Sequence, residues 1–253
     1  MSSLNFVQTG QGPWLVLSHA LGLDLQMWDA VVPRLESRFT VLRYDHRGHG
    51  RSKAVGGAFS IEDLADDAAA LIRSRTDRPV AFVGLSMGGM TAQALAVRAP
   101  GLLGAMVIAN SSDHYPDRAP WQARVQRVRE SGVGSIADGA VERWLTPAWR
   151  ATATGQAAAA RLRATLVATD ASVYAASCEA VAAIDFRETN RGIAVPTLVI
   201  AGRQDLATPP SMSESIAAAI PGAELRSIDA AHISAVERPD ELAALILDFL
   251  EQP

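Results

Sequence analysis

A short glycine-rich run constrains the fold of this chain more than any other feature of its sequence. The apolar segment at residues 80–83 leads directly into Gly84-Leu85-Ser86-Met87-Gly88-Gly89. Such a run is typical of a sharp turn from a strand into a helix, where the glycines allow close packing and the serine takes up a strained backbone conformation. Ser86 is therefore the candidate nucleophile, although a Gly-Ser-Gly cluster between apolar runs is also found in plain loops.

Short aliphatic or β-branched runs alternate with longer helix-like stretches along much of the chain. The runs lie at residues 14–17, 39–43, 80–83, 105–108, 196–202 and 224–228. This alternation predicts an α/β fold with a mostly parallel central sheet flanked by helices. One helix is predicted to begin after Ser60, with Asp63 completing a capping box, and others over residues 90–99 and 240–250.

The middle of the chain, residues 113–192, breaks this alternation. It reads as helical throughout, and it contains three of the five tryptophans, Trp121, Trp144 and Trp149. We predict that it is a helical cap, inserted into a core formed by residues 1–112 and 193–253.

Bulk composition excludes several classes of function. A net charge of -4 with dispersed arginines gives no electrostatic basis for binding nucleic acid or an anionic membrane. Cys178 is the only cysteine, so an intramolecular disulfide and a multi-thiolate metal site are both excluded. The start of the chain lacks the basic and apolar stretches of a secretory signal. We therefore expect a cytoplasmic protein with a small-molecule partner, and its oligomeric state stays open.

Two residues in the second half complete a catalytic constellation with Ser86. A serine hydroxyl needs a neutral imidazole to accept its proton, and the imidazole needs a carboxylate to orient it. Asp205 and His232 each follow a predicted strand, which gives the chain order Ser, Asp, His of the G-x-S-x-G hydrolases. Singly, such residues are more often turn or packing groups. Asp113 is the alternative acid, and Asp229 is interpreted as a loop residue.

Backbone amides are expected to stabilise the oxyanion of a tetrahedral intermediate. In this arrangement one donor belongs to the residue after the nucleophile, here Met87, and one to the loop after an early strand. Residues 15–22 have the pattern of that loop, which makes the Leu21 amide the second candidate. His19 lies in the same loop, and we interpret it as a structural residue rather than a base.

Several longer segments carry a resemblance to known enzymes. These are Leu21-Gly22-Leu23-Asp24-Leu25-Gln26-Met27-Trp28-Asp29, the stretch from Val41 to Ser52 with its Arg47-Gly48-His49-Gly50 turn, the run from Gly84 to Thr91, Ala231-His232-Ile233-Ser234 leading to Glu237-Arg238-Pro239, and the cap stretches 121–124 and 142–146. Through them the chain resembles α/β-hydrolase-fold enzymes, and among these the 3-oxoadipate enol-lactonases. The loop Ser18-His19-Ala20-Leu21 differs from that subfamily and is more similar to broader esterases and carbon-carbon bond hydrolases.

The resemblance implies hydrolysis of 3-oxoadipate enol-lactone to 3-oxoadipate in the β-ketoadipate pathway of aromatic catabolism. The reaction would run through an acyl-enzyme on Ser86, without a metal or an organic cofactor. The substrate carries a carboxylate, for which Arg124 is the candidate partner. The alternative is that Arg124, Arg127 and Arg129 form one solvated helix face. Further candidate substrate-binding residues are Trp121, Trp144 and Met90.

Two other functions remain compatible with the sequence. One is a different hydrolase on the same scaffold, either a carboxylesterase of broader range or a carbon-carbon bond hydrolase. The other is a non-catalytic protein that keeps the fold and uses its pocket only to hold a ligand, because a fold does not by itself establish a function.

Overall fold

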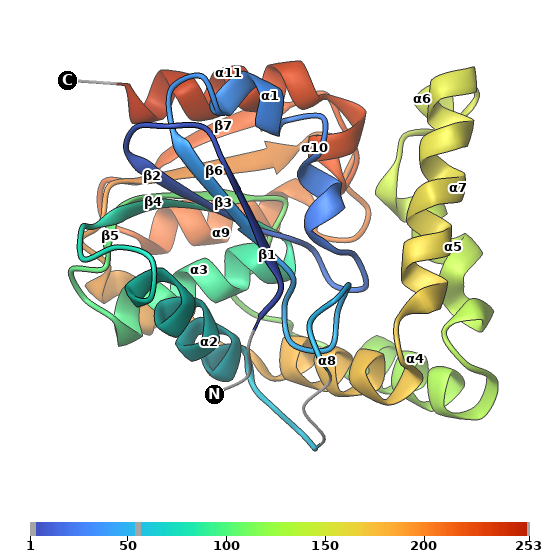
Figure 1. Ribbon diagram of the computed structural model, residues 1–253. Coiled ribbons are helices and arrows are strands. Elements are labelled where there is room, and N and C mark those ends of the chain that lie inside the picture. The colour runs from blue at the N-terminus through green and yellow to red at the C-terminus, as the bar shows by residue number, and fades with distance from the viewer. Residues whose placement is uncertain (1–3, 54–56, 252–253) are drawn as a thin grey trace.

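The computed structural model describes residues 4–53 and 57–251, so the first three residues, on which the expectation about an export signal partly rests, lie outside it. The described residues contain one sheet with the order β1-β3-β2-β4-β5-β6-β7 (Figure 1). Its strands are β1 (Phe6–Thr9), β2 (Trp14–Ser18), β3 (Thr40–Tyr44), β4 (Val80–Leu85), β5 (Leu103–Ala109), β6 (Thr197–Gly202) and β7 (Glu224–Ile228). Every neighbouring pair is parallel except β1 with β3. The predicted mostly parallel sheet is confirmed.

Strand β1 is the one strand that the sequence pattern did not predict. It pairs antiparallel with β3 at the edge of the sheet, from Phe6 opposite Tyr44 to Thr9 opposite Val41. Its two middle residues, Val7 and Gln8, are exposed, so the strand has no continuous apolar run. An edge strand of this kind is held by its backbone pairing more than by burial, which leaves little signal in the sequence.

Helices cover both faces of the sheet. Figure 1 shows α1 (Val32–Leu35) beside α11 (Pro239–Leu250) on one face, and α2 (Ile61–Arg73) beside α3 (Met87–Arg98) on the other. The predicted capping box of α2 is confirmed, because Ser60 Oγ accepts from Asp63 N at 3.2 Å and Asp63 Oδ2 accepts from Ser60 N at 2.7 Å. The remaining helices of the core are η1 (Leu25–Trp28), α9 (Pro210–Ala219) and α10 (Ser234–Glu237).

Residues 113–192, which we call the cap segment, connect β5 to β6. Their helices are α4 (Ala119–Ser131), α5 (Gly134–Trp144), α6 (Pro147–Arg150), α7 (Ala153–Ala168), α8 (Ala171–Ala183) and the short η2 (Thr189–Gly192). Figure 1 shows α5, α6 and α7 standing to one side of the sheet, with α4 and α8 leading to and from them. The status of this segment as a separate domain stays a prediction.

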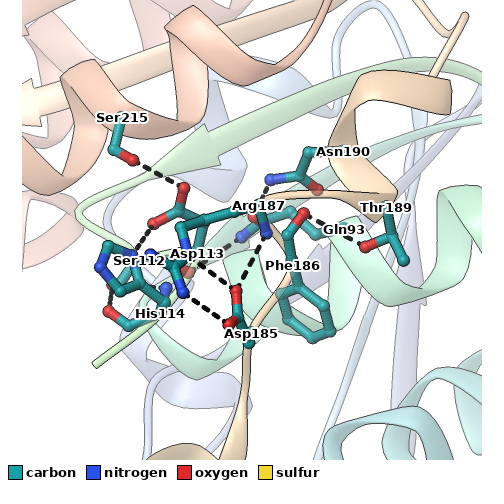
Figure 2. A network of polar contacts seen from close by, with 10 residues as sticks. All are labelled: Gln93, Ser112, Asp113, His114, Asp185, Phe186, Arg187, Thr189, Asn190 and Ser215. Atoms are coloured by element: carbon teal, nitrogen blue, oxygen red, sulfur yellow. Dashed lines mark hydrogen bonds and ion pairs between the residues drawn. The ribbon is translucent and has the colours of Figure 1, made fainter. Parts of the chain in front are cut away.

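The sequence pattern predicted a cap segment that is helical throughout, and this prediction was wrong at the junction with the core. Where the chain leaves and re-enters the core, His114 and Asp185 form an isolated antiparallel bridge, and Phe186 N donates to Asp113 O at 2.8 Å (Figure 2). The backbone N–H and C=O groups of these two extended segments lie outside any helix and need hydrogen-bond partners. The two segments supply these partners to each other.

No helix in the described part of the chain is long and apolar enough to cross a membrane.

Candidate active site

The turn that carries Ser86 has the strained geometry expected of a nucleophile elbow. Ser86 lies between β4 and α3 with φ 57° and ψ -117°, a backbone conformation that is unfavourable for a residue with a side chain. The glycines around it are required by close packing. A Cβ on Gly84 would lie 2.0 Å from Gly88 O, and a Cβ on Gly88 would lie 2.2 Å from Ser18 O.

The structure brings together the three residues that the sequence predicted as a triad. Ser86 Oγ lies 2.9 Å from His232 Nε2, and His232 Nδ1 lies 2.8 Å from Asp205 Oδ2. An ionised carboxylate only accepts hydrogen bonds, so Nδ1 of His232 carries the proton. In the neutral imidazole, Nε2 is then free to accept the hydrogen bond from the Ser86 hydroxyl. The arrangement has the polarity that proton removal from a serine requires.

Asp205 is held by donors that the sequence analysis missed. Its Oδ1 accepts from Ala207 N at 2.8 Å and Thr208 N at 2.9 Å, and its Oδ2 accepts from Thr208 Oγ1 at 2.8 Å and Asn110 Nδ2 at 3.1 Å. Burial by itself would raise the pKa of Asp205, but the electrostatic attraction and hydrogen bond of His232, with the hydrogen bonds from Thr208 N and Asn110, outweigh it and lower the pKa. Asp205 is therefore a carboxylate at neutral pH.

Asp113, the alternative acid, does not contact His232. Its Oδ1 accepts from His114 Nδ1 at 2.8 Å and its Oδ2 accepts from Ser215 Oγ at 2.7 Å, as Figure 2 shows. The carboxyl group therefore points toward α9 and the junction of the cap segment. The geometry does not support the alternative that Asp113 is the acid, which the sequence left open because strand order alone does not tell in which direction a loop residue turns.

His19 is occupied on both ring nitrogens. Its Nε2 accepts from the backbone N–H of His46 at 2.9 Å, so its Nδ1 carries the proton and donates to Ala20 O at 2.8 Å. Complete burial lowers the pKa of His19, which keeps the ring neutral. The interpretation of His19 as a structural residue rather than a base is supported.

A cavity of about 400 Å³ lies over Ser86 and His232, between the core and the cap segment. The candidate oxyanion donor Leu21 contributes to its wall, while Met87 is the first residue of α3 directly after Ser86. Leu206 also lines the cavity. Because this residue is 71% exposed, we place the mouth of the cavity there.

Three of the four predicted substrate-binding residues line this cavity. Trp121, Arg124 and Trp144 all belong to its wall. Arg124 is half-buried, and its Cζ lies 4.5 Å from the centroid of the Trp121 ring, whereas Arg127 on the same helix is exposed. The alternative of one solvated arginine face therefore does not describe Arg124.

Met90 does not line the cavity. Its side chain is 1% exposed within α3 and belongs to the hydrophobic core. The expectation that it contacts substrate is thus corrected, and the reason is its helix position, which directs the side chain into the core instead of toward the cap segment.

Arg143 is a cavity residue that the sequence analysis did not single out. It lines the same cavity as Arg124, and neither guanidinium forms an ion pair with a carboxylate in residues 4–53 or 57–251. Burial, together with the charge of Arg124, lowers the pKa of Arg143. The cavity therefore holds two positive charges that have no counter-ion among the described residues. In the sequence Arg143 stands next to Trp144, a predicted substrate-binding residue, but the sequence does not show toward which side of the helix the arginine side chain points.

Neither a metal centre nor a reactive thiol is found in the described residues. No group of three or more His, Cys, Asp or Glu side chains there is arranged to hold a metal ion. Burial raises the pKa of the Cys178 thiol to about 12, so it stays protonated at neutral pH.

Residues 13–239 match the family model described as alpha/beta hydrolase fold. The chain belongs to the α/β-hydrolase family. This α/β hydrolase is 36% identical to 3-oxoadipate enol-lactonase 2 of Acinetobacter baylyi, over 94% of its own length and 89% of the relative.

Two solved structures extend the comparison. The enol-lactonase from Burkholderia xenovorans LB400 is 38% identical, with a TM-score of 0.95 over 99% of this chain and 97% of the other. A malate-bound thermophilic esterase from Thermogutta terrifontis is 28% identical, with a TM-score of 0.91 over 98% and 92% of the two chains. These relatives are named as lactonases or an esterase, so the expectation of an ester-hydrolysing enzyme is confirmed at the level of the family.

Proposed function

We propose that this α/β hydrolase opens the ring of 3-oxoadipate enol-lactone to give 3-oxoadipate. The observation that carries the proposal is the cavity itself, which is lined by a serine hydrogen-bonded to a histidine and by two arginines that form no ion pair with any carboxylate among the described residues. A small lactone with a carboxylate arm matches this site, because its ester carbonyl can meet the serine and its carboxylate can meet the arginines. The similarity to enol-lactonases from Acinetobacter baylyi and Burkholderia xenovorans supports the same substrate.

The triad supplies the nucleophile in this proposal. His232 Nε2 accepts the proton of Ser86 while Oγ attacks the lactone carbonyl carbon, and Asp205 stabilises the imidazolium that forms. The tetrahedral intermediate collapses with cleavage of the ring C–O bond, and the leaving enol oxygen takes the proton from the imidazolium, which returns His232 to its neutral form. The neutral imidazole then takes a proton from water as the water attacks the acyl-enzyme. Collapse of this second intermediate releases the second carboxylate, and His232 returns the proton to Ser86 Oγ.

Backbone amides stabilise the negative charge of both tetrahedral intermediates. The donors in this proposal are the N–H groups of Leu21 and Met87, which flank the nucleophile from the β2 loop and from the start of α3. No metal or organic cofactor takes part in these steps.

The carboxylate arm of the substrate binds to Arg124 and Arg143 in this proposal. Two half-buried guanidinium groups are well suited to an anionic ligand, because the planar fork of donors on each can pair with both carboxylate oxygens. Trp121 and Trp144 form the apolar wall against which the ring packs. With this substrate the enzyme would act in the β-ketoadipate pathway of aromatic catabolism, in the cytoplasm.

Steady-state hydrolysis of freshly generated 3-oxoadipate enol-lactone tests this function, with a neutral p-nitrophenyl ester measured in parallel. We expect kcat/KM of about 10⁵ per molar per second or more on the lactone, far above the ester. Ser86→Ala should lower both by about 10⁴-fold or more, and the exposed Ser227→Ala should change neither. Turnover of the ester but not of the lactone would overturn the substrate assignment and leave the triad in place.

A carboxylesterase of broader range is the second candidate function. It is favoured by the likeness to the Thermogutta terrifontis esterase and by His19 in the oxyanion loop. A panel of neutral esters separates the two functions, because a broad esterase would turn them over as efficiently as the acidic lactone.

A further inference from the structure

Glu237 is a buried carboxylate, 3% exposed, at the end of α10. Its Oε2 accepts from Thr146 N at 3.2 Å and from Ala231 N at 3.1 Å, and its Oε1 accepts from the Thr146 hydroxyl. No arginine, lysine or histidine in the part of the chain described by the structure forms an ion pair with it. Burial of a carboxylate without a cation is unfavourable unless hydrogen bonds compensate. These three bonds are therefore what keeps Glu237 in place.

The partners of Glu237 belong to two segments that are far apart in the sequence. Thr146 is 91 residues away, in the cap segment, where it forms the N-cap of α6. Ala231 directly precedes the proposed base, His232. The carboxylate therefore bridges the cap segment and the loop that carries the imidazole.

A second bond joins the same two segments. Ile233 N, on the other side of His232, donates to Trp144 O at 2.9 Å. The backbone is thus attached to the cap segment on both sides of the imidazole, directly through Ile233 and by way of Glu237 through Ala231. On the cap side, the side chain of Trp144 forms part of the cavity wall.

We propose that Glu237 is a positioning residue that attaches the cap segment to the His232 loop. It keeps the imidazole and the cavity wall at Trp144 in one relative position during turnover. Because small displacements of a reacting group lower rates steeply, a bridge of this kind contributes to kcat although it touches no substrate. This inference rests on the role of His232 in the proposed function, but not on the identity of the lactone.

A series of variants at position 237 tests the inference. Glu237→Leu removes every acceptor and leaves two buried amides unpaired. Glu237→Gln keeps an oxygen for both amides, and its NH₂ group can donate to Thr146 Oγ1. Glu241→Gln, in the exposed first turn of α11, is the control for loss of one negative charge.

The measurement is turnover of a neutral p-nitrophenyl ester, divided by the concentration of Ser86 that reacts with a fluorophosphonate probe. We expect kcat per reactive serine to fall about 10- to 100-fold in Glu237→Leu with KM nearly unchanged, and to stay close to wild type in the Gln and Glu241 variants. Unchanged kcat per reactive serine in Glu237→Leu, with only a lower Tm, would reduce Glu237 to a structural role and overturn the proposal.

Thr146 provides an independent pair of variants in case Glu237→Leu does not fold. Thr146→Val removes the hydroxyl that donates to Glu237, and Thr146→Ser retains it. We expect a lower kcat per reactive serine in the Val variant and recovery in the Ser variant, and equal kcat values in both would contradict the inference. If Ser86 in the wild-type protein does not react with the probe, the proposed function fails instead, which separates the two failures.

Discussion

Nε2 of His232 lies 2.9 Å from Oγ of Ser86, although the two residues are 146 positions apart in the chain. Ser86 follows β4 and His232 follows β7, and two further strands, β5 and β6, lie between them in the sheet. The imidazole therefore reaches the serine across the carboxyl ends of the sheet, where loops from parallel strands meet. This contact, together with the 2.8 Å contact of His232 with Asp205, underlies the first prediction.

Asp205→Asn should lower kcat by about 10³- to 10⁴-fold, because an amide at this position no longer fixes the tautomer of His232 or stabilises the imidazolium. Asp113→Asn is the matched control, since it changes a second buried carboxyl that contacts His114 and Ser215 instead. We expect it to leave kcat near the wild-type value. Steady-state kinetics on a p-nitrophenyl ester distinguish the two acids, and a larger loss in the Asp113 variant would reverse the assignment.

Arg124→Ala and Arg143→Ala should each lower kcat/KM on the enol-lactone by about 10- to 100-fold, because each removes a charged hydrogen-bond donor to the carboxylate. The neutral ester should be affected much less. Arg127→Ala, on the exposed side of α4, is the control. Equal losses on the acidic and the neutral substrate would show that the arginines support the cap segment rather than bind the carboxylate.

His19 should position the oxyanion loop through its bond to Ala20 O. In a trans peptide the carbonyl and the next N–H point in opposite directions, so holding Ala20 O directs the amide of Leu21. His19→Gln places its amide near the Nε2 position and loses this bond, whereas His19→Asn can retain it through a donor near the Nδ1 position. We expect kcat to fall about 100-fold in the Gln variant and less in the Asn variant. The same kcat in both variants would argue against the role.

Buried histidines should make the folded state sensitive to acid. Burial lowers the pKa of His49 from 6.5 to about 3, so between these pH values the unfolded chain binds a proton that the folded chain does not. Stability is therefore fully present above pH 6.5 and declines as the pH falls toward 3. His49→Gln should reduce the slope of the unfolding free energy against pH by about 1.4 kcal/mol per unit in this window.

Urea unfolding between pH 4.5 and 7 measures that slope. His114→Gln, at a partly exposed site in the cap junction, serves as the control for the loss of one histidine. A His49 variant with the wild-type slope would mean that other groups govern the acid sensitivity, such as the buried His19 and His46, whose pKa values are also lowered.

Local sequence patterns predicted most elements of the core, because a buried strand needs a short apolar run and a helix cap needs particular residues close together in the sequence. The run at 224–228 became β7, and the capping box at Ser60 starts α2 as predicted. The hydrophobic pattern did not predict β1, where burial is weak. It also predicted helix at the cap junction, where His114 and Asp185 instead form a backbone bridge.

Within the candidate site, sequence reasoning identified three of the helix residues that line the cavity, but it missed Arg143 and misplaced Met90. Arg124 and Arg143 lie on different helices of the cap segment, and only helix packing directs both into one cavity. Met90 was predicted to contact substrate, and it lies one helical turn after Ser86, but its side chain faces the core.

The sequence by itself determined the strand-turn-helix at Ser86 and the order of the three candidate catalytic residues. Both follow from short-range rules, since strain at one residue and close backbone packing demand particular neighbours. Only the tertiary structure decided that Asp205 rather than Asp113 contacts His232, and that Glu237 reaches Thr146. Those contacts join residues that are distant in sequence, and their geometry depends on how strands and helices pack, which no local pattern encodes.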